Sequence, residues 1–297
     1  MKPIIFTGAA VAIATPMNAD GSINFDRLGA LIDFNIDNGT DAIVICGTTG
    51  ESATMTDEEH VECIRFAVEK TAKRVPVIAG TGSNHTEYAV NLSKKAEALG
   101  ADAILTVTPY YNKTSQAGLV AHFTAIANAV SIPMILYNVP SRTGVNITPE
   151  TCLKLSKVEN IVAVKEASGN ISQVAKIAAL CGDDLTIYSG NDDQIVPIMA
   201  LGGKGVISVL SNCMPFETHE ICQLCLDGNF AEANKKFLNV LDFANALFCD
   251  VNPIPVKEAL NLMGFNAGPC RMPLVEMSEA NKELLAASMS RLGLIKK

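Results

Sequence analysis

The chain has 297 residues, of which 48% are hydrophobic and 18% are charged. This composition excludes a disordered protein and is sufficient for one large domain, alone or with a small appendage. The net charge of −8 argues against nucleic acids and anionic membranes as partners, and no apolar run reaches the roughly 18 residues that a membrane span requires. Small molecules are therefore the expected partners.

The first residues imitate a secretory signal peptide. Lys2 precedes an apolar run over residues 4–14 that ends in Ala12-Ile13-Ala14, a small-residue pattern typical of a cleavage site. We reject this interpretation because the charged part is a single lysine, and because the same residues are needed as the first strand of the repeat that follows.

Short β-rich runs alternate with amphipathic stretches along most of the chain. The expected strands lie at residues 8–16, 41–49, 75–82, 102–111, 133–140, 161–169, 185–191 and 205–212. Helical patterns lie between them, for example at residues 57–73 and 86–99. Signals for helix starts and ends agree with this pattern, namely Thr56, Thr148, Gly39, Gly100 and Gly182.

Eight strand–helix units with mostly apolar strands favour a closed parallel barrel over an open doubly wound sheet. No strand is followed by GxGxxG, so the dinucleotide-binding fingerprint is missing. Beyond residue 212 only helical patterns remain, at residues 216–226, 230–248, 255–263 and 278–292. We therefore expect an α/β fold with a (β/α)8 TIM barrel over residues 1–224 and a small C-terminal helical domain over residues 225–297.

The nine cysteines are odd in number, scattered and mostly set in apolar runs, which indicates reduced, buried thiols in a cytoplasmic protein. Cys222 and Cys225 form a CxxC, but they lie within a helical pattern and no second pair at zinc spacing accompanies them, which favours core packing. The four histidines are dispersed. No metal and no organic cofactor is expected.

A lysine, Lys165, follows the apolar run 161–164 in the sixth expected strand. One interpretation is structural: the stem lies on the sheet while the ammonium reaches water or pairs with Glu166. The other is functional, because an amine kept out of water has a lowered pKa, is partly neutral near cellular pH and forms Schiff bases with carbonyl compounds. A pocket around that strand end would favour the functional interpretation.

Hydroxyl groups and one arginine follow several other expected strands. They are Thr48, Thr49, Thr108, Tyr110, Tyr111, Tyr137, Ser141, Arg142, Thr143 and Ser189. Because the carboxyl ends of parallel barrel strands meet at one face, these side chains are expected to converge on Lys165. Each alone has an ordinary interpretation as a rim tyrosine, a strand-capping threonine or a surface arginine. Their coincidence at several strand ends favours a catalytic site.

Four segments carry a resemblance to a known family, and they appear in the order that the family has. They are GTTGE at 47–51, YNVPSRTG at 137–144, VKEA at 164–167 and NPIPVK at 252–257. With these segments, the chain resembles the dihydrodipicolinate synthase family of pyruvate-dependent lyases over essentially its whole length. The resemblance implies condensation of pyruvate with L-aspartate 4-semialdehyde in the diaminopimelate route of lysine biosynthesis.

By the resemblance, Lys165 forms the Schiff base with pyruvate, and Tyr137 passes protons in a relay with Thr48 and Tyr111. Tyrosine and threonine hydroxyls suit this role because they transfer protons without adding a fixed charge beside the lysine. The resemblance also places substrate-binding residues. These are Thr49 and the Gly50 turn for the pyruvate carboxylate, Arg142 for the carboxylate of the semialdehyde, and Ile207 and Gly190 beside them.

Two alternatives stay open at this point. Other pyruvate-dependent aldolases, such as N-acetylneuraminate lyase and 2-keto-3-deoxy sugar acid aldolase, share the barrel, the lysine and the tyrosine. Thr48, Thr49, Tyr111 and Arg142 favour the synthase, because a sugar-acid enzyme needs polyol-binding groups in the loop that Arg142 occupies. A non-catalytic, small-molecule-binding relative would lack one of the chemical groups, and none of those named is missing.

The resemblance further implies self-association as a homotetramer, a dimer of dimers in which Tyr111 reaches into the neighbouring subunit's site.

The resemblance also bears on whether lysine, the end product of the route, inhibits the enzyme. In lysine-inhibited relatives the effector contacts residues that match Ser52, Ala53, His60, Asn84 and Tyr110, together with a histidine and a glutamate. Asp57 and Tyr88 stand at these last two positions, so we expect inhibition by lysine to be weak or absent.

Overall fold

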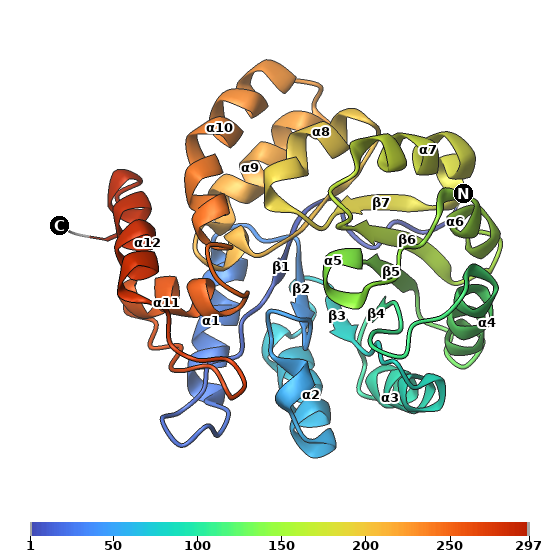
Figure 1. Cartoon of the computed structure of the whole chain (residues 1–297), viewed down its shortest axis with the longest axis horizontal. Coiled ribbons are helices and arrows are strands. Elements are labelled where there is room, and N and C mark those ends of the chain that lie inside the picture. The colour runs from blue at the N-terminus through green and yellow to red at the C-terminus, as the bar shows by residue number, and fades with distance from the viewer. Residues whose placement is uncertain (1, 296–297) are drawn as a thin grey trace.

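The computed structural model describes residues 2–295 and shows a closed barrel of eight parallel strands (Figure 1). Each strand pairs with the next in sequence, and β8 pairs with β1. The strands are β1 Gly8–Ala12, β2 Ala42–Ile45, β3 Val77–Gly80, β4 Ala103–Val107, β5 Met134–Asn138, β6 Ile161–Glu166, β7 Thr186–Ser189 and β8 Gly205–Ser208. The predicted (β/α)8 barrel is confirmed, and residues 8–12 form its first strand.

Every expected strand is present but ends earlier than its apolar run. The fourth, expected over residues 102–111, ends at Val107, and the fifth, expected to reach Pro140, ends at Asn138 and gives way to a short helix, α5 Pro140–Thr143. The apolar runs extend past the strands because hydrophobicity indicates which residues are buried, and not which residues form hydrogen bonds within the sheet. The polar ends of these runs leave the sheet and rim the barrel.

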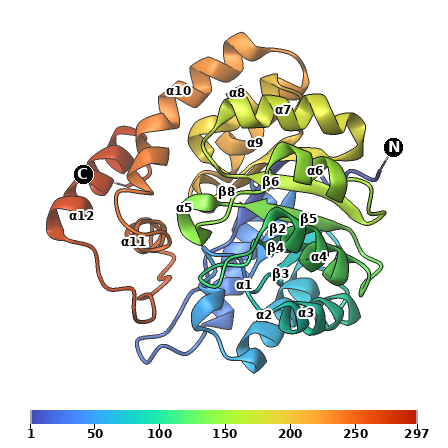
Figure 2. The ribbon, with the colours of Figure 1, turned by 45° about the vertical axis from the view of Figure 1, so that its right-hand side comes forward.

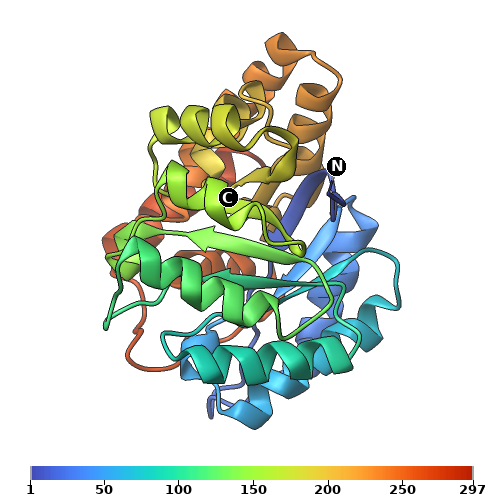
Figure 3. The same cartoon turned by 90° about the vertical axis from the view of Figure 1, so that its right-hand side faces the viewer.

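Helices surround the strands (Figure 3). They are α1 Phe25–Asp37, α2 Asp57–Thr71, α3 Thr86–Ala98, α4 Gln116–Ala127, α6 Pro149–Leu155, α7 Ile171–Cys181, α8 Ile195–Ala200 and α9 Pro215–Leu226. The expected N-caps are confirmed: Thr56 forms a capping box with Glu59, and the Thr148 side chain accepts a hydrogen bond from the Thr151 N–H. Cys222 and Cys225 are free thiols buried in α9.

Side chains alternate between the two faces of the barrel wall, as the period of a strand requires. In β6, Ala163 belongs to the cluster that fills the interior, whereas Val164 belongs to the layer between strands and helices. Phe6, which precedes β1, stacks on Tyr188 with 4.3 Å between ring centroids. This aromatic pair covers the amino-terminal end of the interior, so the barrel opens at the carboxyl ends of its strands.

The last part of the chain is helical, with α10 Phe230–Ala246, α11 Ile254–Leu262 and α12 Glu279–Arg291. Helix α12 packs on both α10 and α11, and Figure 2 shows α11 and α12 together on one side of the barrel. The expected domain boundary at residue 225 falls inside α9, which packs against β1. We propose that the helical domain starts at the turn after α9. Within residues 2–295, no helix has the length and apolarity that crossing a membrane requires.

Candidate active site

Lys165 lies on β6 and points into the barrel. It pairs in register with Tyr137 of β5, and its Nζ lies 4.4 Å from the centroid of the Tyr137 ring. Glu166, the next residue, faces the other side of the wall, where its carboxylate accepts hydrogen bonds from Asn138 Nδ2 at 2.9 Å and from the Ser168 N–H at 2.7 Å. Lys165 is only 5% exposed. The interpretation in which it reaches water or pairs with Glu166 is therefore wrong.

Burial lowers the pKa of the Lys165 ammonium from 10.5 to about 8. Desolvation is the main cause, because a charged group loses its hydration when it is enclosed. The negative charge of Asp192 works in the opposite direction, and the positive charge of Arg142 lowers the pKa further. The amine is therefore partly neutral, and nucleophilic, near neutral pH.

A cavity of about 190 Å³ opens above Lys165 at the carboxyl ends of the strands. It contains six of the eight residues predicted for catalysis and substrate binding. They are Thr48, Thr49, Tyr137, Arg142, Lys165 and Gly190. The predicted convergence of the strand ends on Lys165 is present, since these residues come from the ends of β2, β5, β6 and β7.

Tyr137 supplies a hydroxyl group beside the lysine. Burial raises its pKa, while the charge of Arg142 and a hydrogen bond with Thr48 act in the opposite direction. The phenol therefore remains protonated near neutral pH. It can give a proton to a reacting oxygen and take one back, with Thr48 next to it.

Two groups suited to carboxylates, Thr49 and Arg142, line the cavity and share one neighbour, Asn252. The Asn252 Nδ2 donates to Thr49 Oγ1 at 3.0 Å, and its backbone carbonyl accepts from Arg142 Nη2 at 3.3 Å. Asn252 comes from the helical part of the chain and also lines the cavity. It was not among the predicted site residues, because no strand end marks its position.

Ile207 and Tyr111 lie outside the cavity. Ile207, on β8, is fully buried in the interior cluster that also contains Tyr137. Tyr111 follows β4 with a left-handed backbone (φ 67°) and is 91% exposed. Within one chain, Tyr111 is thus separate from the other residues of the predicted relay.

Asp192 is a second residue that the prediction missed. It follows β7 and is buried, and its Oδ2 accepts hydrogen bonds from the N–H groups of Val209 at 3.0 Å and Leu210 at 2.9 Å. Burial raises the pKa of its carboxyl group, and the charge of Lys165 opposes that shift. The signal was present in the sequence, because two aspartates directly follow Asn191 at a strand end.

A second cavity, of about 400 Å³, shares Thr48, Val139 and Arg142 with the first. Five residues of the predicted effector group line it, namely Ser52, Ala53, His60, Tyr88 and Tyr110. The other two are engaged with neighbours: the Asp57 carboxylate accepts a hydrogen bond from the Tyr88 hydroxyl at 2.6 Å, and the Asn84 carbonyl accepts one from Asn112 Nδ2 at 2.9 Å.

With this geometry established, comparison with known proteins gives a consistent result. The model of the Dihydrodipicolinate synthetase family matches residues 5–292. The chain belongs to this family. A family member from Lachnoclostridium phytofermentans, called 4-hydroxy-tetrahydrodipicolinate synthase, is 60% identical over 292 residues, which are 98% of this chain and 99% of that protein. The family resemblance drawn from the four sequence segments is confirmed.

Two solved structures of dihydrodipicolinate synthases share the fold closely. One, from Cyanidioschyzon merolae, is described as having lysine bound; it is 42% identical, has a TM-score of 0.96 and covers 99% of this chain and 100% of its own. The other is described as a monomeric variant; it is 39% identical, has a TM-score of 0.96 and covers 98% of each chain. Family members are Schiff-base-forming lyases that act on small molecules.

The buried lysine gives a prediction about stability. Because its folded-state pKa of about 8 lies below the ordinary value of 10.5, the folded protein binds fewer protons than the unfolded chain between these pH values. The free energy of unfolding therefore rises with pH across that window, and below pH 8 the lysine costs roughly 3 kcal/mol. We expect Lys165→Met to stabilise the protein at pH 7.

Urea unfolding of the wild type and of Lys165→Met, measured at pH 7 and pH 9.5, checks this. The gain from the substitution should be larger at pH 7 and should shrink at the higher pH. A variant that is less stable than the wild type at pH 7, or a gain that grows with pH, contradicts the prediction.

Proposed function

We propose that this chain is a 4-hydroxy-tetrahydrodipicolinate synthase that holds pyruvate as a Schiff base on Lys165 and condenses it with L-aspartate 4-semialdehyde. The reaction belongs to the diaminopimelate route of lysine biosynthesis. The observation that carries the proposal is the buried lysine with a pKa of about 8, enclosed with neutral hydroxyl groups at the mouth of a barrel. The free state of all nine cysteines fits the proposal that the enzyme works in the cytoplasm.

The lowered pKa matters because only the neutral amine attacks a carbonyl carbon. At pH 7.5 about a quarter of amines with a pKa of about 8 are neutral, against about 0.1% of ordinary lysines. Lys165 Nζ adds to the pyruvate ketone, water leaves, and a protonated imine remains. Loss of a methyl proton then gives the enamine, whose carbon attacks the aldehyde of the second substrate.

Each of these steps moves a proton, and Tyr137 lies beside the lysine to carry it. The hydroxyl donates to the oxygen that leaves as water and, later, to the aldehyde oxygen that becomes the product hydroxyl. Thr48, hydrogen-bonded to Tyr137, links it to the rim of the barrel. A carboxylate in the place of Tyr137 would pair with the ammonium, raise its pKa and slow the attack.

The two substrate carboxylates have separate places. We assign the pyruvate carboxylate to Thr49 and the Gly50 turn, with Gly190 beside the reacting carbons and Ile207 in the floor below them. Arg142, with its planar fork of donors, suits the carboxylate of the semialdehyde. This arrangement and the 60% identity to a named synthase favour the synthase over a sugar-acid aldolase.

Self-association as a homotetramer, a dimer of dimers, is the second part of the proposal. Tyr111 is 91% exposed and Tyr110 beside it is 39% exposed, so two aromatic side chains project from one loop above the barrel. In a two-fold dimer, Tyr111 would enter the neighbouring subunit's site and complete its proton relay. One similar structure is described as a monomeric variant, so the oligomeric state has to be measured for this chain.

The third part of the proposal is that lysine inhibits this enzyme weakly or not at all. A carboxylate paired with the ammonium of a ligand contributes about 1.5–3 kcal/mol, or a factor of roughly 10–100 in affinity. Asp57 is the one residue that introduces a new carboxylate, but the Tyr88 hydroxyl already binds it. Tyr88 also lines the second cavity, and we expect its ring to take up space that an effector would need.

The Schiff base can be trapped. Incubation with pyruvate and borohydride should label Lys165 irreversibly, because reduction of the imine gives a stable secondary amine. Lys257 is also buried, but its Nζ donates to Glu51 Oε1 at 2.8 Å, so it should stay unlabelled. Peptide mass spectrometry locates the adduct.

Lys165→Ala should lower turnover by orders of magnitude, and Tyr137→Phe should slow turnover while some adduct still forms. An adduct on another lysine, or loss of activity with a chelator, would refute the assignment.

The crossing relay can be tested by mixing. We expect Lys165→Ala chains and Tyr111→Phe chains, each nearly inactive alone, to regain activity when they exchange subunits. In such hybrids, one site receives both an intact Lys165 and a partner's intact Tyr111. Light scattering should show a tetramer, and Tyr110→Phe serves as a control on the same loop. If the mixture stays as inactive as the separate variants after subunit exchange has been demonstrated, Tyr111 acts within its own subunit.

A lysine titration at subsaturating pyruvate tests the proposal that lysine inhibits this enzyme weakly or not at all. Half-inhibition should require more than millimolar lysine, because the carboxylate contact is missing. The double variant Tyr88→Glu with Asp57→His should gain sensitivity. Tyr88→Phe is the matched control: it keeps the ring but releases Asp57, so it separates loss of charge from loss of space. Half-inhibition of the wild type below millimolar lysine would contradict the proposal.

A further inference from the structure

The turn from Thr48 to Glu51 has an unusual backbone. Glu51 adopts a left-handed conformation (φ 57°, ψ 32°), which residues other than glycine rarely take. This turn follows β2 and carries Thr48 and Thr49 into the catalytic cavity. Because the conformation is unfavourable in itself, other contacts must hold the turn in place.

Those contacts come from the helical C-terminal part of the chain. The Glu51 side chain is 1% exposed and the Lys257 side chain is 2% exposed. Lys257 Nζ donates to Glu51 Oε1 at 2.8 Å and also to the Pro269 carbonyl, and the Arg271 N–H donates to Glu51 Oε2 at 2.9 Å. Both oxygens of the carboxylate are thus bound by residues more than 200 positions away in the sequence.

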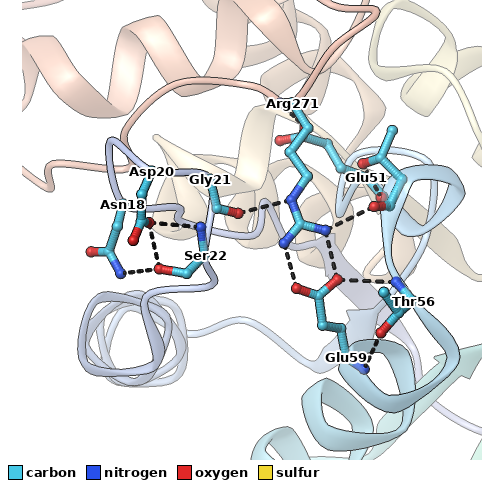
Figure 4. Close-up of polar contacts among 9 residues, drawn as sticks. Asn18, Asp20, Gly21, Ser22, Glu51, Thr56, Glu59 and Arg271 are labelled. Carbon is cyan, nitrogen blue, oxygen red and sulfur yellow. Dashed lines mark hydrogen bonds and ion pairs between the residues drawn. The ribbon is translucent and has the colours of Figure 1, made fainter.

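The Arg271 side chain extends this connection to the neighbouring loops (Figure 4). Its Nε donates to the Gly21 carbonyl at 2.8 Å, and its Nη1 donates to the Thr54 carbonyl at 2.7 Å and to Glu59 Oε2 at 2.6 Å. Glu59 in turn accepts from the Thr56 N–H at 3.0 Å and closes the capping box of α2. One guanidinium therefore joins the loop after β1 to Thr54, near the end of the segment between β2 and α2, and to Glu59 in the first turn of α2.

Neither Lys257 nor Arg271 lines the catalytic cavity. We propose that both are positioning residues: through Glu51 they hold the Thr48–Glu51 turn in the geometry that binds the carboxylate of pyruvate. The inference rests on the proposed function of that turn. It gives the C-terminal helical part of the chain an indirect role in pyruvate binding, in addition to the contact of Asn252 with Thr49.

A purely stabilising role is the alternative. Both roles predict a loss of thermal stability when the connection is broken, because a buried ion pair that loses one partner leaves an unpaired group. Only the positioning role predicts weaker pyruvate binding in protein that is still folded. The measurement is therefore the pyruvate concentration that gives half-maximal borohydride trapping, taken on samples whose circular dichroism matches that of the wild type.

Glu51→Gln is the first variant. Both partners of the carboxylate are donors, and an amide has only one oxygen, so one contact is lost while the size is kept. We expect the half-saturating pyruvate concentration to rise roughly tenfold, the effect of about one hydrogen bond. The KM for the semialdehyde, which Arg142 binds, should change by less than about twofold. Arg291→Ala, which removes an ion pair with Asp242 at 3.0 Å between α12 and α10, is the matched control and should leave both values unchanged.

Arg271→Lys is the second variant, because it keeps the charge and the backbone contact but loses the fork that joins the loops. If Glu51→Gln does not fold, this variant is judged by the same criterion, with an expected rise of roughly threefold or more. An unchanged half-saturation in the folded variants overturns the positioning role. A wild type that forms no pyruvate adduct on Lys165 would instead overturn the proposed function, so the two failures are distinguishable.

Discussion

The enclosure of one amine inside an apolar barrel is the constraint on which the rest of the structure depends. An ammonium group loses hydration there, and among residues 2–295 no carboxylate lies in hydrogen-bond contact with Lys165 to compensate for that loss. Asp192 is near enough to oppose the shift, yet its Oδ2 is bound to two backbone N–H groups. The lysine is therefore kept close to the point where it is half neutral, which is the condition that imine chemistry requires.

The alternation of side chains along β6 decides that the amine of Lys165, and not the neighbouring carboxylate, faces the cavity. Lys165 and Glu166 are adjacent, and a shift of one residue in register would place the carboxylate in the cavity and the amine outside. The outer network prevents such a shift, because Glu166 is bound to Asn138 on β5 and to the backbone of Ser168. Groups that never meet a substrate thus decide which side of the wall carries the chemistry.

The C-terminal helices complete a site that the barrel alone leaves unfinished. Asn252 connects Thr49 with Arg142, and Lys257 and Arg271 hold the turn between β2 and α2. The aromatic pair of Phe6 and Tyr188 covers the opposite end of the interior. The catalytic cavity is therefore bounded or supported by contacts between parts of the chain that are distant in sequence.

The sequence by itself determined the barrel, the order of its strands and the group of residues around Lys165. It could do so because parallel strands place their carboxyl ends on one face, so that local patterns are enough to gather Thr48, Thr49, Tyr137 and Arg142. Only the tertiary structure decided the ends of the strands, the bond between Tyr88 and Asp57, and the contacts of Asn252, Lys257 and Arg271. Asn252 meets Thr49 across 203 residues and Lys257 meets Glu51 across 206, and contacts at such separations leave no periodic trace in the sequence.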